Sequence, residues 1–176
     1  WAELISTPGN EISLMDKWDE KIDAIIKGTL QEDVRSLAGV PSWMLTLMNK
    51  LLETTGKNYI DEIWHNLEVY FHGGVSFKPY RNEFNNIISN KDFKYYEVYN
   101  ASEGFFGIQD SNDARDLLLM LDYGVFYEFI EVSEMEKSEK IIDLSQVQTG
   151  VNYAMLITTN SGLWRYKIGD TIQFTS

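Results

Sequence analysis

The sequence predicts an α/β fold with a parallel βαβ portion followed by an antiparallel β extension. Two observations support this prediction. A strand-length apolar run at 67–74 is followed by a helical pattern at 79–88 and by a second strand-like run that begins near residue 94. Strand, crossover helix and strand imply parallel pairing. From residue 117 onward, apolar runs are separated only by short turn signals, which favours antiparallel strands.

The first third of the chain is expected to be helical. Apolar residues recur at helical spacing over 15–26, and the pattern stops at Gly28. A short helix is expected over 31–37. A further helix is expected to begin at Pro41, a favoured first helical residue, and to end at Gly56.

The last third contains three turn predictions. The run "DLLLMLDYGVFYEFIEV" places Asp122–Gly124 between two apolar segments, which is a hairpin signal. Within "VNYAMLITTNSGLWRYKIGDTIQF", both "TNSG" and "IGD" predict turns between strands. The charged stretch 134–140 is expected to be a solvated loop.

Composition limits the classes of function. The chain has 176 residues, 44% of them hydrophobic, and a net charge of −12. This charge argues against a nucleic-acid partner, which requires clustered Lys and Arg. No apolar run approaches the ~20 residues that span a membrane, so no membrane partner is expected. The chain contains no cysteine, which fits a cytoplasmic location. Because it begins with Trp1, we expect it to be a piece of a longer protein.

Ser102 and Glu103 interrupt an apolar region within "YNASEGFFG". A carboxylate flanked by Gly104 and two phenylalanines is costly unless it has a partner. Glu103 is either a turn carboxylate or a Mg²⁺ ligand, because Mg²⁺ often takes one or two protein carboxylates together with substrate phosphates. Ser102 either caps the next element or donates its hydroxyl to a phosphate.

Asp170 and Tyr99 follow strand-like runs. Asp170 is either a turn residue or a carboxylate that accepts hydrogen bonds from a ribose diol. Tyr99 is either a core residue or a ring that stacks on a purine. The pair Gly73–Gly74 forms a turn or permits close approach of a flat ligand. His72 either lines the ligand pocket or is a structural histidine whose hydrogen bonds are satisfied, and the second interpretation is favoured. Two histidines without cysteine are too few for a zinc site.

Together these fragments resemble a known superfamily. "YNASEG" resembles the Tyr-x-x-Thr/Ser-Glu motif of adenylate-forming enzymes, "WRYKIGD" is similar to their Tyr-Arg-x-Gly-Asp motif, and "HGG" resembles their upstream glycine pair. Within this superfamily, "YNASEGFFGIQ", "YGVFYEFIEV" and "ITTNSGLWRYKIGDTI" look most like the auxin-responsive acyl-acid amido synthetases of plants and their bacterial relatives. "GVPSWM" suits the bacterial branch.

The resemblance assigns roles to the matched residues. It implies that Tyr99 faces adenine, Ser102 the α-phosphate, Glu103 the Mg²⁺ and Asp170 the ribose hydroxyls.

Four further positions receive weaker roles from the same resemblance. Gly73 and Gly74 would form a wall near adenine and the acyl group, and Val75 and Phe105 would line the acyl pocket.

The implied function is that of an ATP-dependent ligase. It would activate a small carboxylic acid as an acyl-adenylate and transfer the acyl group to an amine, usually of an amino acid. The superfamily's upstream phosphate loop and its C-terminal small domain are not found in the sequence. Residues 1–176 are therefore expected to be a fragment of the large AMP-binding domain, whose missing partners are segments of its own parent chain. Alone it should make little or no product.

Two rival functions remain. With 14% aromatic residues and an acidic balance, the chain would suit a non-catalytic carbohydrate binder, which predicts exposed Trp and Tyr on a β-face and Glu103 far from Asp170. A glycosidase would use these two acids as its catalytic pair.

Overall fold

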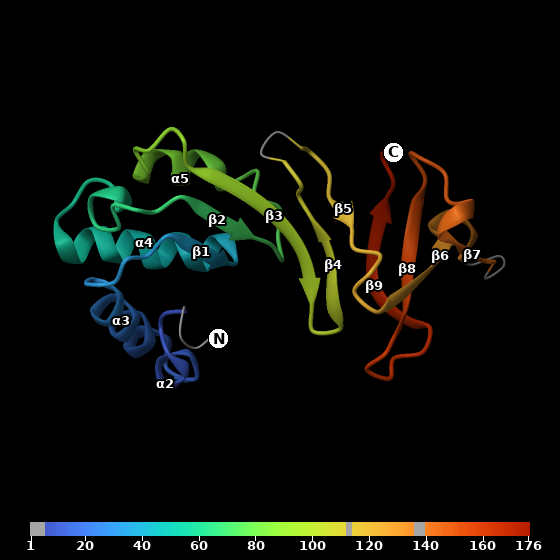
Figure 1. Ribbon diagram of the computed structural model, residues 1–176, viewed down its shortest axis with the longest axis horizontal. Coiled ribbons are helices and arrows are strands. Elements are labelled where there is room, and N and C mark those ends of the chain that lie inside the picture. The colour runs from blue at the N-terminus through green and yellow to red at the C-terminus, as the bar shows by residue number, and fades with distance from the viewer. Residues whose placement is uncertain (1–5, 112–113, 136–139) are drawn as a thin grey trace. The chain divides into compact units, whose positions relative to one another are not determined.

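The computed structural model describes residues 6–111, 114–135 and 140–176. The chain forms two compact units (Figure 1). The first unit comprises Trp1–Val98 and Gln109–Asp113, and the second comprises Tyr99–Ile108 and Ala114–Ser176. The fold class is mixed α/β, as expected.

Among the described residues, α-helices occur only in the first unit. They are α2 (Asn10–Ser13), α3 (Trp18–Thr29), α4 (Pro41–Thr55) and α5 (Arg81–Ile87), with the 3₁₀ turn η1 (Ile60–Glu62) between α4 and α5. The boundaries of α4 follow from local chemistry. Pro41 occupies its first turn, and Gly56 ends it with a φ of 66°, a left-handed conformation that glycine adopts without a steric cost.

The parallel strands of the first unit are β1 (Ser36–Gly39), β2 (Val69–His72) and the start of β3 (Lys94–Ala101). β2 pairs with both β1 and β3 in parallel, and α5 lies in the connection from β2 to β3. The βαβ prediction is therefore confirmed. The helix predicted over 31–37 is wrong, because the backbone from Arg35 onward hydrogen-bonds to the segment of β2 and not to itself.

Aromatic residues fill the core of the first unit. Tyr70 stacks on Phe84 with ring centroids 5.1 Å apart, and Phe77 packs edge-on against Phe84 at 5.3 Å. Phe84 is fully buried, so its burial contributes about 2–3 kcal/mol. This core holds the parallel strands, and hence the turn after β2, in place.

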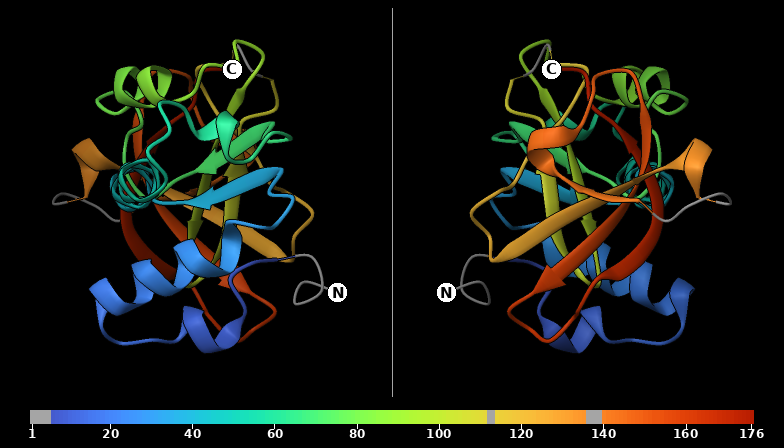
Figure 2. Two further views of the ribbon diagram at one scale, coloured as in Figure 1. Left: turned by 90° about the vertical axis from the view of Figure 1, so that its left-hand side faces the viewer. Right: turned by 90° about the vertical axis from the view of Figure 1, so that its right-hand side faces the viewer.

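The second unit consists mainly of antiparallel strands. They are the end of β3, β4 (Gly104–Ile108), β5 (Leu118–Leu119), β6 (Val125–Glu131), β7 (Ile141–Asp143), β8 (Asn152–Thr159) and β9 (Tyr166–Gln173), with the 3₁₀ turns η2 (Val132–Glu134) and η3 (Leu144–Gln146). β4 pairs with β5, and a four-stranded sheet has the order β7-β6-β8-β9. Figure 2 shows β8 and β9 of this sheet side by side, in orange and red.

Two of the three turn predictions are wrong. The segment around Asp122–Gly124 is no hairpin, because β5 pairs with β4 whereas β6 pairs with β7 and β8. The "IGD" residues lie inside β9. The turn at "TNSG" is confirmed, since it connects β8 to β9.

Most of the predicted loop at 134–140 falls outside the described residues. In the part of the chain that the structure describes, no helix is long and apolar enough to cross a membrane.

Candidate functional site

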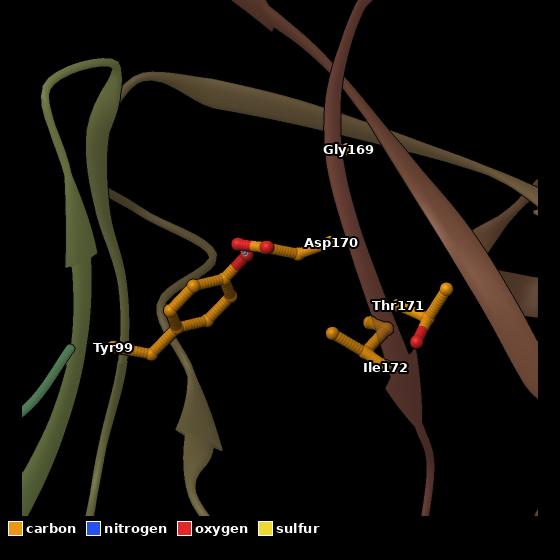
Figure 3. A pocket seen from close by; sticks show the side chains of 5 residues that line it. All are labelled: Tyr99, Gly169, Asp170, Thr171 and Ile172. Atoms are coloured by element: carbon orange, nitrogen blue, oxygen red, sulfur yellow. Dashed lines mark hydrogen bonds between the residues drawn. The ribbon is translucent and has the colours of Figure 1, made fainter. Parts of the chain in front are cut away.

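A hydrogen bond joins two of the predicted site residues within the second unit. The Tyr99 hydroxyl donates to Oδ2 of Asp170 over 2.8 Å, although the two residues are 71 positions apart. Figure 3 shows the Tyr99 side chain pointing at the Asp170 carboxylate. The Tyr99 ring packs on the buried Phe106 with centroids 5.2 Å apart, which fixes the position of its hydroxyl.

An irregularity in β9 determines where Asp170 lies. Leu156 of β8 is paired with Lys167, and Ala154 is paired with Thr171. One residue of β8 therefore faces three residues of β9, 168–170, which is a bulge that bends the strand locally. Gly169, at the centre of this bulge, has a φ of 98°, which L side chains rarely adopt. Asp170 therefore lies in a bulge within β9, directly after a glycine of positive φ, and not in a turn between strands.

A pocket opens beside this pair. It has a volume of about 470 Å³ and is lined by Tyr99 and by the four consecutive β9 residues Gly169, Asp170, Thr171 and Ile172. Figure 3 shows these side chains around it. Pockets of about 300–1,000 Å³ are typical of small-molecule sites. An aromatic ring, a carboxylate and a hydroxyl in such a pocket suit a ligand with a flat ring and a diol.

Ser102 and Glu103 form the turn between β3 and β4. In the sequence this turn follows Tyr99, which lines the pocket, by three residues. Burial is the largest cause that raises the pKa of Tyr99 well above its ordinary value, followed by the hydrogen bond and charge of Asp170 and by the charge of Glu103. The Tyr99 hydroxyl thus stays protonated at neutral pH.

The other predicted site residues are divided between the two units. Phe105 belongs to the second unit, where its ring contacts that of Tyr123 at 5.9 Å. Gly73, Gly74 and Val75 belong to the first unit. Gly74 has a φ of 80°, so this position favours glycine, and Val75 is exposed. Their places in a nucleotide or acyl site stay predictions.

An ion pair between Arg165 and Glu128 was not predicted from the sequence. Arg165 donates from Nε to Glu128 Oε2 over 2.9 Å and from Nη2 to Oε1 over 2.8 Å. Glu128 is buried on β6. A glutamate inside the apolar run "FYEFI" was the available signal, because a buried carboxylate requires a partner.

His72 differs from its prediction in one respect. It is structural and buried, as expected, but neither ring nitrogen has a hydrogen-bond partner. The ring stacks on Phe77 with centroids 4.0 Å apart. Burial, with a smaller contribution from Arg81, lowers the pKa of His72 to about 4. Among the described residues, no group of three or more His, Cys, Asp or Glu could hold a metal ion.

Comparison with known families accounts for both units. A model described as the GH3 family N-terminal domain matches residues 1–93, and one described as the GH3 family central domain matches residues 118–176. The chain belongs to the GH3 family. GH3 proteins in the curated set include a probable indole-3-acetic acid-amido synthetase of Oryza sativa subsp. japonica, 33% identical over 82 residues, which covers 44% of this chain and 18% of that protein.

Further GH3 relatives agree with this assignment. An indole-3-acetic acid-amido synthetase of Arabidopsis thaliana is 34% identical over 83 residues, with 44% of this chain and 14% of that protein covered. Among solved structures, the GH3.15 acyl acid amido synthetase has a TM-score of 0.73 at 17% identity and covers 96% of this chain and 40% of its own. A 2-hydroxyisobutyryl-CoA ligase has a TM-score of 0.64 at 14% identity, with coverages of 90% and 35%.

These structural likenesses establish the fold, which this chain shares with part of the GH3.15 acyl acid amido synthetase and part of the 2-hydroxyisobutyryl-CoA ligase. The chain spans less than a fifth of the length of these curated relatives and about 40% of the GH3.15 structure.

Proposed function

We propose that this chain is part of an ATP-dependent ligase that activates a carboxylic acid as an acyl-adenylate and transfers the acyl group to an amine. Membership of the GH3 family supports the class of reaction. The observation that carries the proposal is the Tyr99–Asp170 hydrogen bond at the wall of a ligand-sized pocket, because it unites the two motif residues that adenylate-forming enzymes use for adenine and ribose.

Each residue of the site has a chemical role in this proposal. The Tyr99 ring offers a face for adenine, and the Asp170 carboxylate accepts hydrogen bonds from the ribose hydroxyls. The Ser102 hydroxyl donates to the α-phosphate. Glu103 supplies one carboxylate for Mg²⁺. No further acidic residue is required, because substrate phosphates and water complete the coordination of Mg²⁺. Bound Mg²⁺ would neutralise charge on the phosphates.

In the first half-reaction, a carboxylate oxygen of the acid attacks the α-phosphorus of ATP. The bond from this phosphorus to the bridging oxygen breaks, and pyrophosphate leaves with the electron pair. Negative charge on the phosphate oxygens rises in the transition state, where fixed donors such as the Ser102 hydroxyl stabilise it. Neither Glu103 nor Asp170 has to transfer a proton.

In the second half-reaction, the amine nitrogen attacks the acyl carbon, the bond to the phosphate oxygen breaks, and AMP leaves. The proton lost by the amine passes to solvent. We propose that segments of the parent protein outside residues 1–176, including a phosphate loop and a C-terminal small domain, complete both steps. Gly73, Gly74, Val75 and Phe105 are proposed to line the adenine and acyl sites. We also propose a cytoplasmic location, which cell fractionation would test.

A pyrophosphate-release assay of the full-length protein against a panel of carboxylic acids and amino acids tests this function. We expect release that depends on ATP, Mg²⁺ and one class of acid. Glu103→Gln should raise the Mg²⁺ concentration required for half-maximal rate, whereas the exposed β6 residue Glu131 provides a matched control as Glu131→Gln. A wild-type protein that binds no nucleotide and releases no pyrophosphate with any acid would refute the proposal.

The carbohydrate-binding alternative has one observation in its favour. Trp164 is 84% exposed and Tyr166 is 41% exposed at the start of β9, and exposed aromatic residues suit sugar stacking. Its second requirement, a large separation of Glu103 from Asp170, stays a prediction. Family membership favours the ligase over both the carbohydrate binder and the glycosidase.

A further inference from the structure

The ion pair between Arg165 and Glu128 connects the start of β9 to β6, two strands away in the sheet. Arg165 lies immediately before β9, and β8 separates β9 from β6. Two parallel hydrogen bonds of 2.9 and 2.8 Å join the guanidinium to the carboxylate. A bidentate pair of this kind fixes both distance and orientation.

The backbone of Arg165 is also held in an uncommon conformation. Its φ of 44° is positive, and no other non-glycine residue of the described ranges shares this feature. Its backbone N–H donates to Oγ1 of Thr158 on β8 over 3.1 Å. Positive φ costs a non-glycine residue free energy and persists only where surrounding contacts impose it. The backbone and side-chain bonds of Arg165 are such contacts.

Glu128 lies on the face of the sheet opposite to the hydrophobic core of the second unit. Tyr127 and Phe129, its neighbours on β6, belong to the hydrophobic core that also contains Tyr99. Because side chains alternate along a strand, Glu128 points to the other face. Asp170 bonds to Tyr99 on the core side. Neither Arg165 nor Glu128 lines the pocket, so we expect the ion pair to affect the site through β9.

We propose that the Arg165–Glu128 pair is a positioning device that fixes the start of β9 and thereby the place of the Asp170 carboxylate. Between Arg165 and Asp170, β9 makes two residue pairs with β8 and then bulges at 168–170. The bulge interrupts the β8–β9 ladder locally and bends β9 just before Asp170. An anchor immediately before it holds Asp170 where it can accept hydrogen bonds from ribose. This inference rests on the proposed nucleotide site.

A role in stability alone would not require this arrangement. The Arg165 side chain is 64% exposed, and an exposed cation adds little stability in an ion pair. Replacement of a whole buried ion pair by well-packed apolar residues is often neutral or stabilising. A role in positioning Asp170, five residues further along the chain, explains this bidentate pair better than a role in stability does.

A double-mutant cycle on the full-length protein tests the inference. Arg165→Lys retains the charge but loses the bidentate fork, and Glu128→Gln retains the shape of the partner. Each should weaken ATP binding about tenfold, measured by calorimetry, with little change in melting temperature. In an Asp170→Asn background the same substitutions should have no further effect, because they act through Asp170. Arg35→Lys is the control, because Arg35 forms a surface ion pair in which Nε and Nη2 both donate to Oδ2 of Asp33.

The outcomes separate this inference from the proposed function. Equal losses of ATP affinity with and without Asp170 would overturn the inference, as would unchanged affinity or failure of both single variants to fold. A wild-type protein that does not bind ATP would refute the proposed function. In that case crystal structures of the Arg165→Lys and Glu128→Gln proteins decide the positioning role independently. Loss of the Tyr99–Asp170 hydrogen bond in them supports it, and an unchanged bond excludes it.

Discussion

The Tyr99 hydroxyl donates a 2.8 Å hydrogen bond to Asp170. This bond joins a residue near the end of β3 to a residue in the bulge of β9. Tyr99 is also part of the apolar core of the second unit. The pair therefore couples the packing of this unit to the orientation of a carboxylate in the pocket.

Replacement of Asp170 by asparagine tests the ribose role. Asp170→Asn removes a charged acceptor, and we expect the KM for ATP to rise about 10- to 100-fold, since hydrogen bonds to charged groups contribute about 1.5–3 kcal/mol. Steady-state kinetics of the full-length protein measures this change. Asp122→Asn, at an exposed position before β6, should leave the KM unchanged. An equal effect of both substitutions would contradict the assignment.

Two substitutions at Tyr99 separate its ring from its hydroxyl. Tyr99→Phe keeps the packing on Phe106 but leaves Asp170 without its donor, so we expect weaker ATP binding and a small change in the free energy of unfolding. Tyr99→Ala removes the ring, and we expect a loss of about 2–4 kcal/mol in urea unfolding. If Tyr99→Phe binds ATP as tightly as the wild type, the hydroxyl does not orient Asp170.

Gly169 tests the role of the bulge in β9, and Gly150 provides a matched control. Their φ angles are 98° and 80°, and a Cβ on either would meet no atom within 4 Å. Alanine at either position should therefore cost about 1–2 kcal/mol through backbone strain alone. Only Gly169→Ala should also weaken ATP binding, because it changes the bulge that presents Asp170. Unfolding curves and ATP titrations of both variants check this difference.

His72 should make the stability of the first unit depend on pH. Its folded-state pKa is about 4, below the value of about 6.5 for an unfolded chain. Above pH 6.5 the ring is neutral in both states. As the pH falls from about 6.5 to about 4, only the unfolded chain gains the proton, and stability decreases by up to about 3 kcal/mol. Chemical unfolding at several pH values measures this loss.

A phenylalanine at position 72 would remove this contribution and fit the aromatic surroundings of Tyr70 and Phe77. We expect the difference in stability between His72→Phe and the wild type to grow as the pH falls through the same window. His65→Gln, at an exposed position, should leave the pH profile unchanged. A constant difference between His72→Phe and the wild type would show that His72 does not titrate as described.

The 176-residue chain alone is expected to make little or no product. We propose that phosphate binding and the second half-reaction need segments outside it, so ATP-dependent adenylate formation should be at background level when this chain is assayed with acids that the full-length protein uses. Detectable acyl-adenylate above that level would overturn the proposed division of the parent protein.

Local signals in the sequence were sufficient for several elements. Pro41 and Gly56 determined the ends of α4 because their effects on backbone conformation act within a few residues. The βαβ portion could be predicted because, between residues 67 and 104, the apolar pattern changes from that of a strand to that of a helix and back. The motif residues Tyr99, Ser102, Glu103 and Asp170 could be identified because the spacing of residue types in a motif is visible without a structure.

Tertiary structure decided the features that depend on distant partners. Ser36–Gly39 forms a strand because β2 is beside it, and the segments around Asp122–Gly124 pair with different strands and not with each other. The sequence by itself determined which residues are proposed to carry the chemistry. Only the fold determined that Asp170 meets Tyr99 and that Arg165 meets Glu128, because hydrogen bonds across 71 and 37 residues depend on sheet register, which no local pattern encodes.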